Sequence, residues 1–250
     1  MTGPDEEPQV LGTQAAYDLW STTYDDDPNG LIVLERRFAI PRLDPRPDER
    51  ILDAGCGTGD HLAALIDHGS APIGLDLSLG MLHRARMKAP SAPVLSASLS
   101  EGLPFEPDRF DGVLCSLVSE HLADLDRFFS EIHRVLRPGG RLVFSGLHPE
   151  RVADGLTAGF EVDGRRYRVD AAPHTLANFI DAARRSGLDV TQVEEASVDH
   201  DLVQVAPRVG RFLGKKLLFI MSARRPLDPP PARVERDRGG PVSYTHLRAH

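Results

Sequence analysis

The stretch "ILDAGCGTGDHL", residues 51–62, places three glycines and two carboxylates between an apolar run and a helix-like segment. The apolar residues 51–54 predict a buried β-strand that ends directly in the glycines. Glycine has no Cβ and tolerates positive φ, so a glycine-rich turn lets a ligand approach the backbone. In an open parallel sheet, ligands bind at this carboxyl end of the strands. The stretch therefore predicts a binding loop at a sheet edge.

Short strand-like runs alternate with helix-period segments on both sides of this loop. Five strands separated by helices of this length imply parallel pairing through right-handed crossovers. A hairpin at 159–170, a helix at 175–187 and two further strands follow. The fold class predicted is α/β, a doubly wound, mostly parallel seven-stranded sheet of Rossmann-like type. The expected strands are 50–54, 71–77, 92–98, 110–116, 141–147, 189–198 and 215–223. The expected helices among the first five strands are 61–69, 78–89 and 122–140. Ser78 is the expected N-cap of the second helix, and Pro138 with two glycines is expected to end the third.

Composition narrows the classes of function. The chain has 250 residues, 41% of them hydrophobic and 26% charged, which is ordinary for a globular protein. Its net charge of -8 disfavours binding to nucleic acid through phosphate contacts. No apolar run reaches the roughly 18 residues of a membrane-spanning helix, and the acidic start is unlike a secretory signal. We therefore expect a cytoplasmic protein with no membrane partner, and two free thiols at Cys56 and Cys115.

The carboxylates beside the glycines indicate the charge of the ligand. The dinucleotide fingerprint G-x-G-x-x-G would need its third glycine at position 60, which holds Asp60. Asp53 and Asp60 would repel a pyrophosphate and attract an ammonium or sulfonium group. Asp76 follows Gly59 at about the twenty-residue interval at which an acid binds a ribose diol. Adenosine joined to a positively charged amino acid describes S-adenosylmethionine.

At this point the sequence resembles the class I S-adenosylmethionine-dependent methyltransferases, in the type 11-like branch that acts on small molecules. The likeness covers about residues 50–150, with weaker likeness at 15–29 and 215–223. The segments that carry it are "ILDAGCGTGD" (51–60), "GLDLSLGML" (74–82), "EGLPFEPDRFDGVLCSLVSEHL" (101–122) and "EIHRVLRPGGRLVFSGLHPE" (131–150).

The resemblance implies a set of cofactor-binding residues. Asp53 and the three glycines match the motif that holds the methionine moiety, and Asp76 matches the ribose acid. Met81 is either an adenine contact or core. Where the family commonly has an Asp for the adenine amine, this chain offers Ser98, a weaker acceptor. The full expected set is Asp53, Gly55, Cys56, Gly57, Thr58, Gly59, Asp76, Leu77, Ser78, Met81, Ser98, Leu99 and Ser116.

Three aromatic residues near the start of the chain share one helical face. Tyr17, Trp20 and Tyr24 are spaced by three and four residues, which is typical of packing. By the resemblance they belong instead to a helix that closes over the cofactor, where aromatic faces would stabilise a sulfonium and exclude water. The domains expected are therefore a helical cap (1–45), a methyltransferase domain (46–223, with a hairpin insert at 158–170), a disordered tail (224–241) and a translated sequencing adapter (242–250).

The reaction makes few demands on side chains. Methyl transfer from a sulfonium is an in-line displacement, for which alignment and exclusion of water supply most of the acceleration. A base is needed only if the acceptor must lose a proton. Glu120, His121 and His148 follow the fourth and fifth strands and are the candidates, each with a structural role as the alternative. No metal site is expected, and Cys56 is given no chemistry.

The acceptor class follows from the segments outside the matched core. Arginines at 165, 166 and 168 on the hairpin would suit a carboxylate or phenolate if the hairpin roofs the pocket; a solvated edge is the alternative. Base methyltransferases of this fold place prolines and an aromatic after the fourth strand, where this chain has "SLVSEHL", so a small-molecule acceptor is expected. The alternatives are a non-catalytic S-adenosylmethionine-binding protein and an NAD-dependent dehydrogenase. The acceptor atom, O, N or C, and the oligomeric state are left open.

Overall fold

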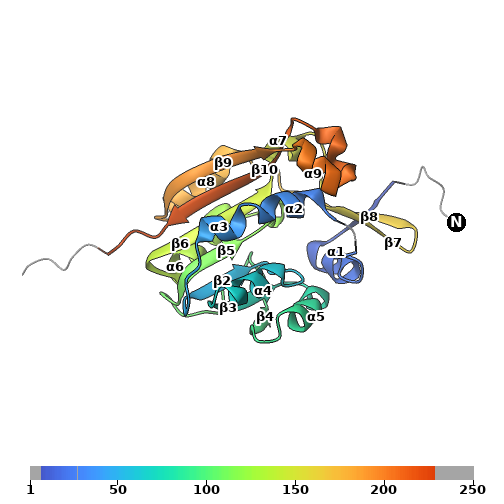
Figure 1. The fold of residues 1–250 in the computed structure, drawn as a ribbon. Coiled ribbons are helices and arrows are strands. Elements are labelled where there is room, and N and C mark those ends of the chain that lie inside the picture. Colours follow the sequence, from blue (N-terminus) through green and yellow to red (C-terminus); the bar gives the residue numbers. More distant parts are fainter. Residues whose placement is uncertain (1–6, 27, 229–250) are drawn as a thin grey trace, which may run out of the picture.

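The structure is a computed structural model that describes residues 7–26 and 28–228 (Figure 1). Its main feature is a seven-stranded sheet with the order β4, β3, β2, β5, β6, β10, β9. The strands from β4 to β6 pair in parallel, and β10 runs antiparallel to both of its neighbours. The predicted fold class is thereby confirmed. The strands are β2 (Arg50–Ala54), β3 (Ala71–Asp76), β4 (Val94–Ser96), β5 (Phe110–Cys115), β6 (Leu136–Leu147), β9 (Asp189–Ser197) and β10 (Lys216–Arg224).

Alternate residues of the central strands pack against helices on opposite faces, as the two-residue period of a strand requires. Leu52 and Phe144 share a buried cluster with residues of α6 (Leu125–Val135) and α8 (Leu176–Arg185). Their neighbours Ile51 and Val143 share another with α3 (Ala39–Leu43) and α4 (Asp60–Asp67). α5 (Leu79–Lys88) packs on α4 through a third cluster. Both faces of the sheet are therefore covered.

A second, three-stranded sheet stands at one end of the main sheet. Its order is β1 (Gln9–Leu11), β8 (Arg165–Val169), β7 (Gly159–Val162), with β1 parallel to β8. Helix α1 (Thr13–Trp20) lies beside the β7–β8 hairpin in Figure 1. We call this assembly of β1, α1 with the turn that follows it (21–26), β7 and β8 the cap. The hairpin was expected, but its pairing with a strand from the start of the chain was not, because three residues carry no readable period.

The connection between α6 and β6 differs from the expectation. The predicted helix at 122–140 ends at Val135, and strand β6 begins at Leu136, so Pro138 and the glycines lie within the strand. Leu136 has extended backbone and pairs with Phe110, with a register irregularity after that pair. Helices too short to show a period were also missed: α2 (Gly30–Arg36), α3, α7 (Pro149–Ala153), α9 (His200–Val205) and the 3-10 turns Ser119–His121 and Pro207–Phe212. The expected N-cap Ser78 is confirmed.

At its C-terminal end the chain is described as far as residue 228. Of the expected tail at 224–241, residues 224–228 are described, and the first of them ends β10; the rest, with 242–250, lies outside the described residues. In the part of the chain that the structure describes, every helix is too short or too polar to cross a bilayer.

The aromatic side chain of Phe144 is central to the larger core. It is fully buried, and its ring centroid lies 5.3–5.8 Å from those of Phe128, Phe129, Phe179 and Phe219. We expect Phe144→Ala to lower the free energy of unfolding by about 3–5 kcal/mol, because it leaves a cavity in a close-packed cluster. Urea unfolding measures this, with the exposed Leu227→Ala as control. A loss as small as that of the control would contradict this account of the core.

Candidate functional site

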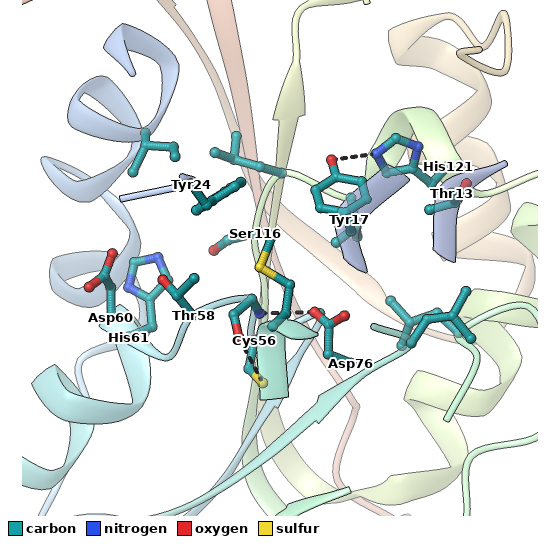
Figure 2. Close-up of a pocket in the computed structure, with 18 of the residues that line it drawn as sticks. Thr13, Tyr17, Tyr24, Cys56, Thr58, Asp60, His61, Asp76, Ser116 and His121 are labelled. Atoms are coloured by element: carbon teal, nitrogen blue, oxygen red, sulfur yellow. Dashed lines mark hydrogen bonds between the residues drawn. The ribbon is translucent and has the colours of Figure 1, made fainter. Parts of the chain in front are cut away.

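A cavity opens at the carboxyl ends of the parallel strands, where the strand order changes direction between β2 and β5. Its floor comes from the loops after β2, β3, β4 and β5, and its roof from α1 and the turn that follows (Figure 2). The expected site residues that line it are Tyr17, Tyr24, Gly55, Cys56, Gly57, Thr58, Asp76, Leu77, Met81, Ser98, Leu99, Ser116 and His121.

The glycine loop leaves space for a ligand at its centre. Gly57 has φ +51°, and a Cβ built on it would meet no described atom within 4 Å. A Cβ on Gly55 (φ +85°) would lie 2.5 Å from Cγ1 of Val118, so this turn needs glycine for a different reason. Gly59 does not line the cavity; a Cβ there would lie 3.0 Å from Cα of Ala85 on α5. Gly57 therefore leaves space on the ligand side, Gly55 makes room for Val118, and Gly59 lets α4 and α5 approach each other.

The carboxylate of Asp76 is held at the cavity wall by backbone donors. Oδ2 accepts a hydrogen bond from the N–H of Gly57 (2.9 Å), and Oδ1 accepts one from the N–H of Ser78 (2.9 Å). Burial raises the pKa of Asp76, and these backbone hydrogen bonds oppose the rise. A carboxylate has about four lone-pair sites, so roughly two are left for a diol. This arrangement fits a ribose.

Asp53 does not line the cavity. It is buried on β2, and neither oxygen has a hydrogen-bond partner among the described residues. Burial raises its pKa to about 7, the charge of His61 opposes this, and the carboxylates of Glu35 and Asp76 add to it. Its contribution to a bound cation would come through its charge beneath the loop.

The residues after Asp76 divide between the cavity and the helix that follows. Ser78 does not line the cavity: its hydroxyl accepts from the N–H of Met81 (3.1 Å) and donates to Asp18 on α1 (2.6 Å). Met81 is fully buried and also lines the cavity, so its placement fits either of its expected roles. Leu77, Ala97 and Leu99 line the cavity as well, and their apolar side chains are suited to contact with an aromatic base.

The aromatic residues of the cap form a continuous series. Tyr17 is on α1 and Tyr24 in the turn after it, and both line the cavity. Trp20 does not; its ring stacks on Phe160 of β7 (4.9 Å, 7°), which in turn stacks on Tyr167 of β8 (5.3 Å). Burial raises the pKa of Tyr17 well above its ordinary value, so its phenol stays neutral. Trp20 thus joins α1 to the hairpin, and the two tyrosines face the ligand.

Of the three candidate bases, the structure brings only His121 to the cavity. Its Nε2 is hydrogen-bonded to Oη of Tyr17 (2.9 Å; Figure 2). Glu120 is buried outside the lining, where its oxygen accepts from Ser119 (3.2 Å). The expectation that His148 is a candidate base is corrected. His148 is the N-cap of α7: its Nδ1 accepts a hydrogen bond from the N–H of Glu150, and its Nε2 donates one to Glu195 (2.6 Å). Since both ring nitrogens are engaged away from the cavity, His148 is withdrawn as a base.

The structure also shows where the hairpin residues and the two cysteines lie relative to the cavity. Hairpin residues do not line the cavity, and Arg168 forms an exposed ion pair with Asp170 (2.6 Å), which agrees with the solvated-edge alternative. The hairpin packs on α1 through Phe160. Both cysteines are buried and unpaired. Burial raises the pKa of the Cys56 thiol, which keeps it protonated. In the described part of the chain, no group of three or more His, Cys, Asp or Glu residues could hold a metal ion.

Sequence reasoning missed part of the cavity wall. Glu35 on α2 is the clearest omission; its only sequence signal is an acid on the same face as the apolar residues Leu31 and Leu34. Leu117 was also missed, and it has the strained φ of +56° directly after β5. The further lining residues are Thr13, Ile32, Arg36, Asp60, His61, Ala97, Ser100, Val118 and Leu122.

Comparison with known proteins agrees with the geometry. A family described as "Methyltransferase domain" matches residues 52–144. An uncharacterized methyltransferase of Emericella nidulans is 30% identical over 244 residues, which covers 78% of this chain and 84% of that protein. The chain belongs to the S-adenosylmethionine-dependent methyltransferases. The crystal structure of such an enzyme from Mesorhizobium loti superposes with a TM-score of 0.65 at 28% identity, covering 77% of this chain and 98% of the other.

The name of another relative of this chain specifies its substrate. The demethylmenaquinone methyltransferase of Corynebacterium kroppenstedtii is 36% identical over 126 residues. The match covers 50% of this chain and 52% of that protein, so the chain spans about half of this relative's length.

The assignment of Asp76 to the ribose predicts a binding defect. Asp76→Ala should weaken binding of S-adenosylhomocysteine roughly tenfold or more, because charge-assisted hydrogen bonds to a diol are worth about 1.5–3 kcal/mol. Isothermal titration measures this. Asp170→Ala, on the exposed hairpin end, is the control. Unchanged affinity in Asp76→Ala would refute the assignment.

The raised pKa of Asp53 predicts a pH dependence of stability. The folded state holds a proton that the unfolded chain releases near its ordinary pKa of 3.8, so this contribution to stability is full below that value and is lost as the pH rises through about 7. Asp53→Asn has no such loss. Its free energy of unfolding, relative to the wild type, should rise by about 2–3 kcal/mol from pH 5 to pH 8. A difference that stays flat with pH would contradict the buried, unpartnered carboxyl.

Proposed function

We propose that this methyltransferase methylates a small-molecule acceptor that binds beneath the cap. The observation that carries the proposal is the closure of the cavity by the cap. Oδ1 of Asp25, in the turn after α1, accepts a hydrogen bond from Thr58 in the glycine loop (2.8 Å), and Oδ2 pairs with Lys88 (3.0 Å). A roof tied to the floor in this way leaves room for a compact acceptor rather than for a folded macromolecule.

The character of the cavity supports the same class of acceptor. Tyr17, Tyr24, Ile32 and Leu117 supply apolar and aromatic surface to the cavity. The name of the Corynebacterium relative refers to demethylmenaquinone, an acceptor of low molecular mass. An acceptor with an apolar or aromatic body would bury its surface here favourably.

The residues of the chain supply position and proton transfer. When bound, S-adenosylmethionine provides an electrophilic methyl group on a sulfonium. The cap excludes water, and Tyr17 and Tyr24 hold the acceptor against the floor of the cavity. Where the nucleophilic atom of the acceptor carries a proton, that proton leaves by way of Tyr17: Oη of Tyr17 accepts it and gives its own proton to Nε2 of His121. Nδ1 of His121 is buried, so Nε2 is the ring nitrogen that takes part.

A labelling experiment tests the acceptor class. The chain is incubated with methyl-labelled S-adenosylmethionine and a cell extract divided at a molecular mass of a few kilodaltons. We expect the label to pass to the small-molecule fraction. Transfer to the macromolecular fraction alone would contradict the proposal, and tight cofactor binding without transfer to either fraction would favour a non-catalytic binding protein.

A substitution tests the role of His121 once a labelled product is found. His121→Gln should lower kcat by about 10²-fold or more, the usual contribution of a positioned base. Its affinity for S-adenosylhomocysteine should stay within a factor of about 3, because the proposed role concerns the acceptor. His148→Gln, away from the cavity, is the matched control and should keep most of the wild-type kcat. Equal kcat values in the two variants would remove His121 from the mechanism.

A further inference from the structure

Glu35 lies at the wall of the cavity although it precedes the segment that the family match covers. Its side chain is 1% exposed. Oε1 accepts hydrogen bonds from the hydroxyls of Ser116 (2.6 Å) and Ser145 (3.2 Å), and Oε2 lies 2.9 Å from Nε2 of His61. These partners come from three separate segments, after β5, in β6 and in α4. These three hydrogen bonds compensate the free-energy cost of burying the carboxylate of Glu35.

The partner His61 carries a positive charge more readily than an ordinary histidine. Burial by itself lowers its pKa, but the hydrogen bond and the charge of Glu35, with the charge of Asp53, raise it above the usual value. Its side chain lines the cavity and is 15% exposed, so it can reach a ligand. The pair therefore offers the cavity one negative and one positive group side by side.

A second pair of charges lies next to the first. Arg36 of α2 and Asp60 of α4 form an ion pair, and both line the cavity. Figure 2 shows Asp60 and His61 together on the side of the cavity opposite His121, with Asp76 between the two sides. Tyr17 lies beside His121 on that opposite side. The cavity thus has an aromatic end, a carboxylate suited to a diol in the middle and an end with charges of both signs.

This order of groups matches the order of groups in the cofactor. We propose that Glu35, His61 and Arg36 bind the amino acid end of S-adenosylmethionine. Glu35 accepts a hydrogen bond from the ammonium group, for which about one of its four lone-pair sites is left. His61 and Arg36 donate to the carboxylate. The assignment depends on the cofactor and not on the acceptor. It can therefore be tested independently of the proposed function.

The experiment compares two ligands that differ only at the amino acid end. Isothermal titration is run with S-adenosylhomocysteine and with 5′-methylthioadenosine, which has the same adenosine thioether without the ammonium and carboxylate. For Glu35→Gln we expect a loss of affinity for S-adenosylhomocysteine of roughly tenfold or more, and an affinity for 5′-methylthioadenosine within a factor of about 2 of the wild type.

The matched control is Glu49→Gln, which also removes a carboxylate from an ion pair, with Arg141, but at the opposite end of β2. It should leave both affinities unchanged. His61→Gln is the second variant and should show the same selective loss, which keeps the test decisive if Glu35→Gln folds poorly. Equal losses for the two ligands, or no loss for either, would overturn the assignment. Unchanged binding of S-adenosylhomocysteine with a lower kcat would also overturn it and would make the pair part of the acceptor chemistry.

Discussion

The burial of carboxylates at one edge of the sheet is the constraint on which the site depends. Asp53, Asp76 and Glu35 all lie with little exposure around the glycine loop. Each is compensated differently: Asp76 by backbone N–H groups, Glu35 by hydroxyls and an imidazole, and Asp53 by holding its proton. Ionised carboxylates in a poorly solvated place cost stability unless a cation or hydrogen-bond donors compensate them. The acceptor sites that remain free on Asp76 and Glu35 therefore favour a ligand that brings hydrogen-bond donors or a positive charge.

The cap covers part of this edge, so that a cavity forms beneath it. It is assembled from the beginning of the chain and from the hairpin, which are joined by the pairing of β1 with β8 and by the stacking of Trp20 on Phe160. Asp18 and Asp25 then tie it to α5 and to the glycine loop. Aromatic side chains thus hold the cap together, while polar ones attach it to the floor.

The sequence was sufficient for the sheet and for placing the residues that belong to one continuous segment. The position of the glycine loop and of Asp76 at the cavity could be predicted because a strand end, a turn and an acid at fixed spacing are properties of such a segment. Glu35 could not, since its role depends on Ser116, Ser145 and His61, which are distant in sequence and meet only in the fold. His148 was misassigned for the converse reason. It follows a strand at the correct edge, but its ring is taken up by the first turn of α7 and by Glu195 of β9.

The hairpin was predicted correctly as an element, but its contact with the rest of the cap was not. The sequence offered its arginines as acceptor contacts, whereas the residue that connects the hairpin to α1 is Phe160. Charge is conspicuous in a sequence, whereas the contribution of one aromatic ring depends on what it stacks against.

Titration of the purified chain with S-adenosylmethionine, S-adenosylhomocysteine and NADH in parallel tests the central claim most directly. The account predicts saturable binding of the first two at one site and no binding of NADH, because Asp60 stands where the dinucleotide-binding motif needs its third glycine. Binding of NADH without binding of the other two would contradict it, and Asp60 would then be the residue to explain.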